Sequence, residues 1–231
     1  MLKVTGIRLL DDLISPLIRS WIVEFYGDLS LILKVAHYAM AYMSRLGLVY
    51  VVFNLEFGGV DTLYIVRVCR MLDCKLNNII VSRAFRLSDT VNILEDLSKL
   101  KNTNIFLVLP YGYLPVDPLR YSNATKITGL IRRISLDNQV IVFNTTSKFG
   151  YNKPEGGSLH HHSVNIIVRL SYLRRGLILA SLIKHPVKPL SSRVFSEGIL
   201  NHPIQSLRQN SLLKYLTSSS PITSGGVTIG S

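Results

Sequence analysis

The sequence predicts an α/β fold with a mostly parallel central sheet, helices on both faces and an antiparallel β-hairpin near the C-terminus. Short apolar runs alternate with segments of helical periodicity from about residue 21 to residue 144. These runs are continuously apolar, which indicates strands that are buried on both faces. The composition agrees, because 48% of the residues are hydrophobic and only 17% are charged.

The elements follow from the position of each run. Strands are expected at residues 21–26, 48–55, 78–82, 104–109 and 139–144. Helices are expected at residues 29–45, 60–72 and 88–100, with Ser88 as the cap of the third, and from Ser122 or Asn123 to Leu136. Strands separated by helices in this way predict parallel pairing with crossover connections.

The pattern changes after Asn144. A loop rich in glycine, lysine and serine is followed by "NIIVRLSYL", the turn "RRG" and "LILASLIKHP", which together predict the hairpin. We therefore divide the chain into an N-terminal segment (1–17), a core domain (18–215) and a flexible tail (216–231) that lacks a core-forming pattern.

The net charge of +12 favours a polyanionic partner, and nucleic acid is the commonest one. The alternatives to nucleic acid binding are a basic surface that only confers solubility and an acidic protein partner. Lys34 and His37 interrupt the most apolar segment, so no membrane span is expected. The first residues carry two aspartates and no signal-peptide cleavage pattern, which leads us to expect a cytoplasmic protein.

Cysteine and histidine do not predict a metal site. Cys69 and Cys74 lack the spacing of a zinc or Cys-x-x-Cys site and are interpreted as thiols in or near the core. Side chains diverge along the "HHH" run at 160–162, and His37 on an apolar helix is typical of a hydrogen-bonded core histidine. No metal or other cofactor is expected.

Six stretches, taken in order, resemble the RecA/RadA recombinase family over roughly Ile18 to Leu200. They are "EFYG" with "VAHYA", "VVFNLEFG", "IIVSRAF", "VIVFN", "GGSLHHHSVNIIVRL" and "LIKHPVKPLSSRVFSEGIL". The resemblance implies a RecA-like core and suggests an archaeal-type RadA paralogue.

The family's phosphate loop, G-x-x-x-x-G-K-[ST], is degenerate in this sequence. Gly27 is the only glycine of the motif, and the degenerate loop also contains the polar residues Asp28, Ser30 and Lys34. Leu31, Ile32 and Leu33 stand where phosphate needs space, and the register of Lys34 matches the residue after the family's hydroxyl position. Bound nucleotide is therefore not expected.

The family's magnesium-binding aspartate is also missing, because Leu109 and Pro110 occupy the end of the corresponding strand. Glu56 matches the position of the family's catalytic glutamate. Without phosphate or metal ligands it has nothing to activate, so a structural or ion-pairing role is expected. The sequence predicts a non-enzyme without NTP hydrolysis.

The resemblance also locates two DNA-binding loops. The candidates for DNA contact in the first loop are Arg120, Tyr121 and Lys126. Those in the second loop are Lys148, Tyr151 and Lys153. The basic surface is extended by Arg174 and Arg175 at the hairpin tip. Cationic side chains would neutralise phosphates and tyrosines would stack on bases, whereas the alternative for each residue is a solvated loop side chain.

Three functions follow from the sequence and the resemblance. The first is a DNA-binding accessory in recombinational repair, with a recombinase or another paralogue as partner. The second is a protein-interaction subunit that does not bind DNA, and the third is a residual nucleotide-binding regulator. Because the family's Phe-x-x-Ala linker is not found ahead of the core, we expect a homodimer or a heteromeric complex rather than a filament.

Overall fold

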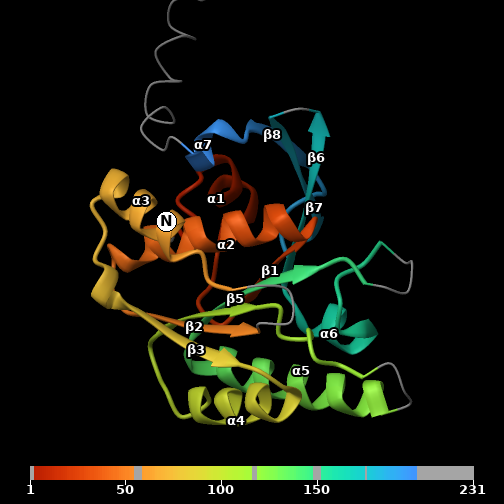
Figure 1. The fold of residues 1–231 in the computed structure, drawn as a ribbon. Helices are drawn as coiled ribbons and strands as arrows, with labels where there is room; N and C mark the ends of the chain where they lie inside the picture. Colours follow the sequence, from red (N-terminus) through yellow and green to blue (C-terminus); the bar gives the residue numbers. More distant parts are fainter. Residues whose placement is uncertain (1–2, 55–58, 116–118, 148–151, 175, 202–231) are drawn as a thin grey trace, which may run out of the picture.

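A computed structural model describes residues 3–54, 59–115, 119–147, 152–174 and 176–201. Figure 1 shows the arrangement of the elements. In chain order they are α1 (Arg8–Ile14), β1 (Ile22–Gly27), α2 (Leu29–Ser44), β2 (Val49–Asn54), α3 (Thr62–Leu72), the 3₁₀ turn η2 (Leu76–Asn78), β3 (Ile79–Ala84), α4 (Leu87–Leu97), β4 (Asn104–Val108), α5 (Leu119–Asp137), β5 (Gln139–Thr145), α6 (Gly157–Ser163), β6 (Ile166–Arg174), β7 (Leu177–Lys184), β8 (Ser192–Ser196) and α7 (Gly198–Asn201).

The strands form one 8-stranded sheet in the order β3-β2-β4-β5-β1-β6-β7-β8. Strands β1 to β6 pair in parallel, and β7 and β8 are added antiparallel to the β6 edge. The predicted α/β class and the antiparallel hairpin are confirmed. The short strand β8 is not among the predicted elements, because its serine-flanked sequence has little apolar character.

Helices cover both faces of the sheet, which explains the continuously apolar strands. Helices α1, α2 and α3 lie on one face and α4 and α5 on the other (Figure 1). Phe25 and Phe143 belong to the core under α2, with ring centroids 5.6 Å apart, whereas Tyr26 and Val142 face the core under α5. Every residue of β1 is therefore buried.

Two helix starts differ from the prediction for a local reason. The N-cap of α4 is Arg86, so Ser88 lies inside the first turn and does not cap the helix. Helix α5 already includes Leu119, and the Ser122 hydroxyl donates to the Leu119 carbonyl oxygen at 2.9 Å. Ser122 thus bonds to a helix carbonyl instead of accepting from a free amide, a known alternative to capping, whereas the Ser88 hydroxyl donates to the Asp89 carboxylate.

The N-terminal residues pack against the core through α1. The buried carboxylate of Asp11 accepts hydrogen bonds from the backbone N–H groups of Val4, Thr5 and Gly6 and from the Thr5 hydroxyl, at 2.9 to 3.1 Å. Burial raises the pKa of the Asp11 carboxyl, while these hydrogen bonds lower it. The apolar side chains of α1 join the core, and the helix contacts β7 and β8.

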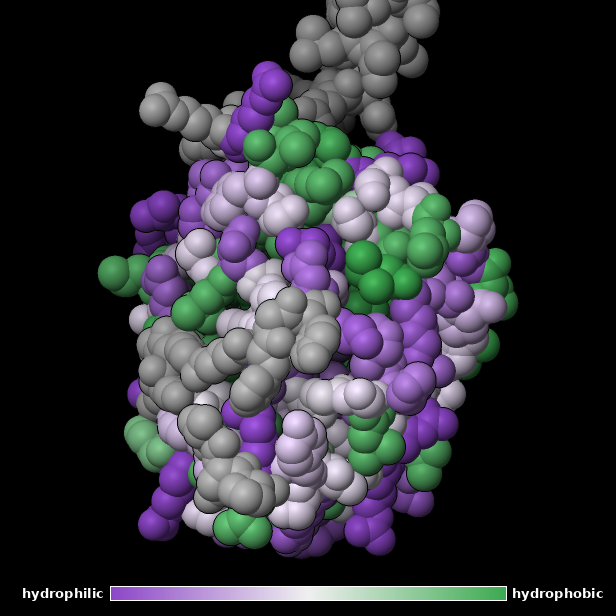
Figure 2. Space-filling model, turned by 90° about the vertical axis from the view of Figure 1, so that its right-hand side faces the viewer, coloured by the Kyte–Doolittle hydropathy of each residue, from purple (hydrophilic) through white to green (hydrophobic). Residues whose placement is uncertain are grey.

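Figure 2 views the side of the molecule on which β6, β7 and β8 lie in Figure 1. Hydrophobic patches alternate there with hydrophilic ones. On these strands the exposed apolar side chains include Leu173, Leu177 and Val194. Within the described ranges, no helix has both the length and the apolar character that a bilayer span requires. The predicted tail, 216–231, lies outside the described residues.

Candidate functional site

The turn between β1 and α2 contains a single residue. Gly27 ends β1, Asp28 is the N-cap, and α2 begins at Leu29. Gly27 has a φ of +150°, and a Cβ at this position would lie 1.9 Å from the carbonyl oxygen of Leu170 on β6. The glycine is therefore required by the close approach of two paired strands.

The residues after this turn are part of the core. Leu31 and Ile32 have no exposed surface and pack with the other side chains beneath α2. Leu33 is partly buried against the same cluster, and Ser30 is exposed. The first turn of α2 thus presents apolar side chains to the core.

Lys34 is engaged by an acidic partner from the C-terminal part of the chain. Its Nζ lies 2.6 Å from Oε1 of Glu197, which also accepts from the Tyr172 hydroxyl at 3.1 Å. The hydrogen bond to Glu197 raises the pKa of Lys34, and the same bond lowers the pKa of Glu197. Asp28 also turns to this side, where its carboxylate accepts from the Tyr172 N–H at 3.4 Å.

The end of β4 is shaped by hydrogen bonds from Leu109. This residue has a φ of +56° and is buried. Its N–H donates to the Phe143 carbonyl at 2.8 Å, and its own carbonyl accepts from the Asn54 amide at 2.7 Å. Glu56, the match to the family's catalytic glutamate, lies outside the described residues.

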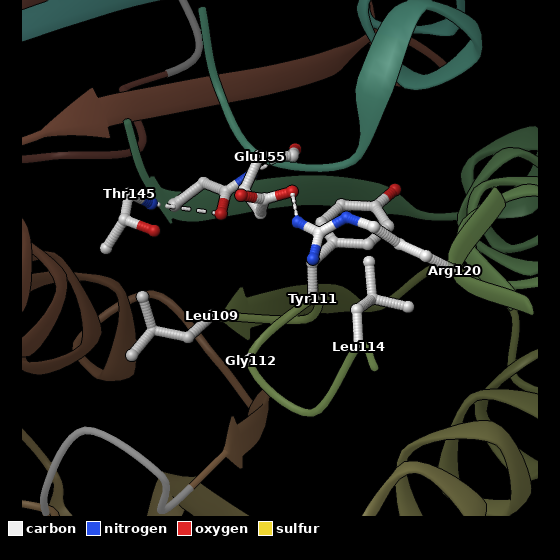
Figure 3. Close-up of a pocket in the computed structure, with 8 residues that line it drawn as sticks. Leu109, Tyr111, Gly112, Leu114, Arg120, Thr145 and Glu155 are labelled. Carbon is white, nitrogen blue, oxygen red and sulfur yellow. Dashed lines mark hydrogen bonds and ion pairs between the residues drawn. The ribbon is translucent and has the colours of Figure 1, made fainter. Parts of the chain in front are cut away.

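A pocket opens beyond the carboxyl ends of β4 and β5 (Figure 3). Its volume is about 20 Å³, enough for one water molecule. It is lined by Leu109, Tyr111, Gly112, Leu114, Arg120, Asn144, Thr145 and Glu155. A wider pocket of about 160 Å³ shares Leu114, Arg120 and Glu155 with it. Together they form a cleft between the segments that follow β4 and β5.

Arg120 and Glu155 form a buried ion pair at the centre of this cleft (Figure 3). Their side chains are 11% and 10% exposed. Arg120 also donates to the Pro115 carbonyl at 3.4 Å, and Glu155 accepts from the Gly156 N–H at 3.2 Å. The pair therefore connects α5 to the segment that precedes α6.

Next to the cleft, a buried hydrogen-bond network joins β1, β5, α5 and α6 with the segment that follows β4. Glu24 Oε1 lies 2.8 Å from His160 Nε2, and His160 Nδ1 lies 2.8 Å from the Tyr111 hydroxyl. Tyr111 also bonds to Thr128 Oγ1 at 2.9 Å, and the Asn144 amide donates to Glu24 Oε1 at 2.9 Å. Burial raises the pKa of Tyr111 well above its usual value, so its hydroxyl remains protonated. Sequence reasoning missed this network; a glutamate within an apolar strand was the available signal.

Helix α6 is fixed at its other end by Lys184 of β7. The Nζ of Lys184 donates to the carbonyl oxygens of His161, His162 and Val164, at 2.6 to 3.0 Å. Burial lowers the pKa of Lys184. Cationic donors at the last carbonyls stabilise a helix C-terminus.

The predicted DNA contacts lie in different environments. Tyr121 is 77% exposed, and Lys153 and Arg174 are also exposed. Lys126 is exposed but lies 3.5 Å from the Glu95 carboxylate, and Arg120 is in the buried ion pair. Lys148, Tyr151 and Arg175 lie outside the described residues.

The histidines serve separate structural roles. His160 is buried in the network, whereas His162 is exposed. His37 Nδ1 donates to the Leu33 carbonyl at 2.6 Å, and its Nε2 accepts from the Asp61 N–H at 3.1 Å. Among the described residues, no three His, Cys, Asp or Glu side chains are grouped to hold a metal ion. The two cysteines are free thiols, one buried and one half-buried.

Comparison with known proteins gives matches in structure only. No protein-family model and no curated protein sequence matches the chain. The crystal structure of the RadB recombinase superposes with a TM-score of 0.68 at 18% sequence identity, covering 85% of this chain and 96% of that chain. A second solved structure, that of an ATPase domain, superposes with a TM-score of 0.59 at 12% identity, covering 83% of this chain and 86% of that chain. The chain therefore has the RecA-like α/β fold found in recombinases and their ATPase relatives.

Proposed function

We propose that this protein is a non-catalytic, RadA-type recombinase paralogue that binds DNA with the segments after β4 and β5. It would assist a recombinase in recombinational repair. One observation carries the proposal: Asp28 alone joins β1 to α2, and the helix that follows it turns its apolar side chains into the core. This packing supports the proposal that the chain lacks the family's nucleotide site.

The proposed absence of catalysis rests on the charges around the β1–α2 turn and the end of β4. Phosphoryl transfer depends on cations and metal ligands that stabilise charge on the transferred group. Here Lys34 is paired with Glu197, and Leu109 stands where the resemblance places the magnesium-binding aspartate. The turn offers a single glycine, whose conformation is set by contact with β6. These features support a protein that does not hydrolyse NTP.

The proposal of DNA binding rests on the cleft and its surroundings. The carboxyl ends of the strands are where ligands bind in open α/β sheets. The cleft lies at this edge, where the exposed side chain of Tyr121 lines it and the exposed Lys153 lies two residues before the lining residue Glu155. Because Arg120 is held by Glu155, we assign it a positioning role rather than direct contact with phosphate.

A fluorescence-anisotropy titration tests this function directly. The chain is titrated with single-stranded and duplex oligonucleotides at two salt concentrations. We expect the logarithm of affinity to fall with the logarithm of salt concentration, with a slope of about −0.7 to −0.9 per phosphate contact. The double variant Lys148→Ala/Lys153→Ala should bind more weakly and with a shallower slope. Exposed lysines far from the cleft, such as Lys99 and Lys101, provide the matched control.

A protein-interaction subunit is the second candidate, and one observation favours it. Leu173, Leu190 and Val194, in and around the antiparallel strands, are 53%, 70% and 46% exposed. These side chains lie along the antiparallel edge of the sheet, and apolar surface left exposed at such an edge favours a protein contact. Binding of a recombinase without measurable DNA affinity at physiological salt would favour this candidate over the first.

A further inference from the structure

The wider of the two pockets in the cleft has the volume that one aromatic ring requires. Its volume is about 160 Å³. A cavity of about 150 Å³ in another protein accommodates benzene, which sets the scale. The pocket lies between Leu114, the first turns of α5 and the start of α6. It is therefore bordered by both segments that we assign to DNA binding.

The lining of this pocket combines an apolar wall with one exposed aromatic ring. Leu114 and Ala124 are 9% and 7% exposed, and both line the pocket. Tyr121 also lines it, yet its side chain is 77% exposed. In contrast, Tyr26, Tyr38 and Tyr111 are almost completely buried. An exposed ring at the mouth of an apolar pocket is available for stacking on a planar ligand.

Two consecutive glycines, Gly156 and Gly157, also line the pocket and differ in their surroundings. A Cβ on Gly156 would lie 2.7 Å from the ring of Tyr111, so this residue is packed against the buried network. At Gly157, with a φ of +78°, a Cβ would meet no atom within 4 Å. The wall at Gly157 is therefore bare backbone beside open space, and a flat ligand can approach it closely.

The polar groups of the pocket favour a neutral ligand over a phosphate. The guanidinium of Arg120 is paired with the Glu155 carboxylate, so the charge of the pair is balanced. Ser147 and Ser158 add hydroxyl groups, which can both donate and accept hydrogen bonds. A nucleobase presents the matching features, since it has two stacking faces and an edge of donors and acceptors.

We propose that this pocket accepts one unstacked base of a single-stranded nucleic acid. The inference rests on the proposed DNA-binding function and goes further, because it names the ligand group and the preferred strand state. A paired base cannot enter without the cost of unpairing and unstacking. The protein therefore binds single strands more tightly than duplex at equal charge.

The test compares oligonucleotides that differ only in their bases. Affinities are measured by anisotropy for a single-stranded oligonucleotide, for an abasic oligonucleotide with the same number of phosphates, and for the duplex. We expect the Kd of the intact single strand to be lower than that of the abasic strand by a factor of about ten or more. Tyr121→Ala should remove most of this preference, whereas the salt dependence should remain because the phosphate contacts are kept.

A second variant fills the pocket. Ala124→Leu adds a branched side chain to its apolar wall and should reduce the preference for intact bases. Thr125→Leu, at the neighbouring exposed position of α5, adds a similar side chain outside the pocket and is the matched control. Circular dichroism and a melting curve establish that each variant is folded. Because Tyr121 is exposed, Tyr121→Ala remains informative if Ala124→Leu does not fold.

The outcomes separate this inference from the function on which it rests. Salt-dependent binding with equal affinity for intact and abasic strands would refute the base pocket and leave the proposed DNA binding intact. Binding to neither oligonucleotide at either salt concentration would refute the DNA-binding function and the base pocket with it. Loss of base preference in Tyr121→Ala and Ala124→Leu but not in Thr125→Leu would support the pocket.

Discussion

The structure gives several residues that the RecA-like resemblance singles out a packing or hydrogen-bonding role. Gly27 is the example with the sharpest geometry. The resemblance associates it with a phosphate loop, whereas the structure shows that its missing side chain allows β1 to approach Leu170. The glycine could be predicted to be special from the sequence. Its reason could not, because the partner strand is more than a hundred residues further along the chain.

Gly27→Ala provides a direct test of this role. The new Cβ would overlap the Leu170 carbonyl oxygen, and alanine at this φ is strained. We expect the free energy of unfolding, measured by urea denaturation, to fall by about 1–3 kcal/mol. Gly47→Ala is the control, because a Cβ there would meet no atom within 4 Å, and its effect should stay within about 0.5 kcal/mol. Equal stability of the two variants would contradict the structural role of Gly27.

His37 predicts a pH dependence of stability. Burial removes the imidazole from water and lowers its pKa, an effect larger than the opposing one of the hydrogen bond to the Leu33 carbonyl. The unfolded chain therefore binds more protons than the folded chain just below the ordinary histidine pKa of about 6.5. Stability should be complete above that pH and should decrease as the pH falls toward the lowered pKa of the folded state.

Urea denaturation from pH 5 to pH 8 measures this effect. Burial also lowers the pKa of His161 and His185, so the wild-type curve contains contributions from all three histidines. The difference between wild type and His37→Gln isolates His37. The variant should lose less stability than the wild type between pH 6.5 and pH 5, and parallel curves would exclude the assignment.

At the scale of elements, the sequence predicts the strands and helices that have an apolar pattern. It misses the short helices that are held by single polar side chains. Strands β1, β2, β4 and β5 can be predicted because burial on both faces leaves continuously apolar runs. Helix α6 has no apolar period, since its sequence is "GSLHHHS", and its buried contact is made through His160. Helix α1 is missed because Asp11 interrupts its apolar run, although this carboxylate accepts hydrogen bonds from the preceding turn.

The Glu24–His160–Tyr111 network fixes the relative positions of β1, α5 and α6, and one hydroxyl links its two halves. Tyr111→Phe removes that hydroxyl and leaves His160 Nδ1 and Thr128 Oγ1 without their partner. We expect a loss of about 1–3 kcal/mol in the free energy of unfolding. Tyr121→Phe, which removes an exposed hydroxyl, is the matched control and should be nearly neutral. A neutral Tyr111→Phe would show that the hydroxyl does not hold the elements together.

At the scale of the whole molecule, the excess of positive charge is left without acidic partners. The exposed carboxylates of Asp96 and Asp137 and the partly exposed one of Asp89 each lie within 4 Å of a cation. Among the described residues, several exposed cations have no such partner, among them Arg67, Arg70, Lys75, Arg132, Arg133 and Arg193. The net charge of +12 could be calculated from the sequence, whereas its distribution depends on which lysines and arginines the fold brings beside an acid.

The proposed loss of nucleotide binding predicts the response of the whole fold to ATP. A ligand that binds only the folded state raises the melting temperature, by an amount that follows from RT ln(1 + [L]/Kd). We expect millimolar ATP with magnesium to leave the melting temperature unchanged and to yield no phosphate above the buffer background. A nucleotide-dependent rise in melting temperature would instead support the residual nucleotide binder.

Lys184 has a consequence for the thermodynamics of association. It holds the carboxyl end of α6 to β7, while His160 holds the same helix to β1 and the first segment of the cleft. These hydrogen bonds hold one wall of the cleft in place before DNA binds. Little conformational entropy is therefore lost in this wall when the complex forms. Lys184→Met removes these hydrogen bonds at the end of α6 and should make the entropy of DNA binding more unfavourable. Isothermal titration calorimetry would detect this change even if the contacts between protein and DNA are unaltered.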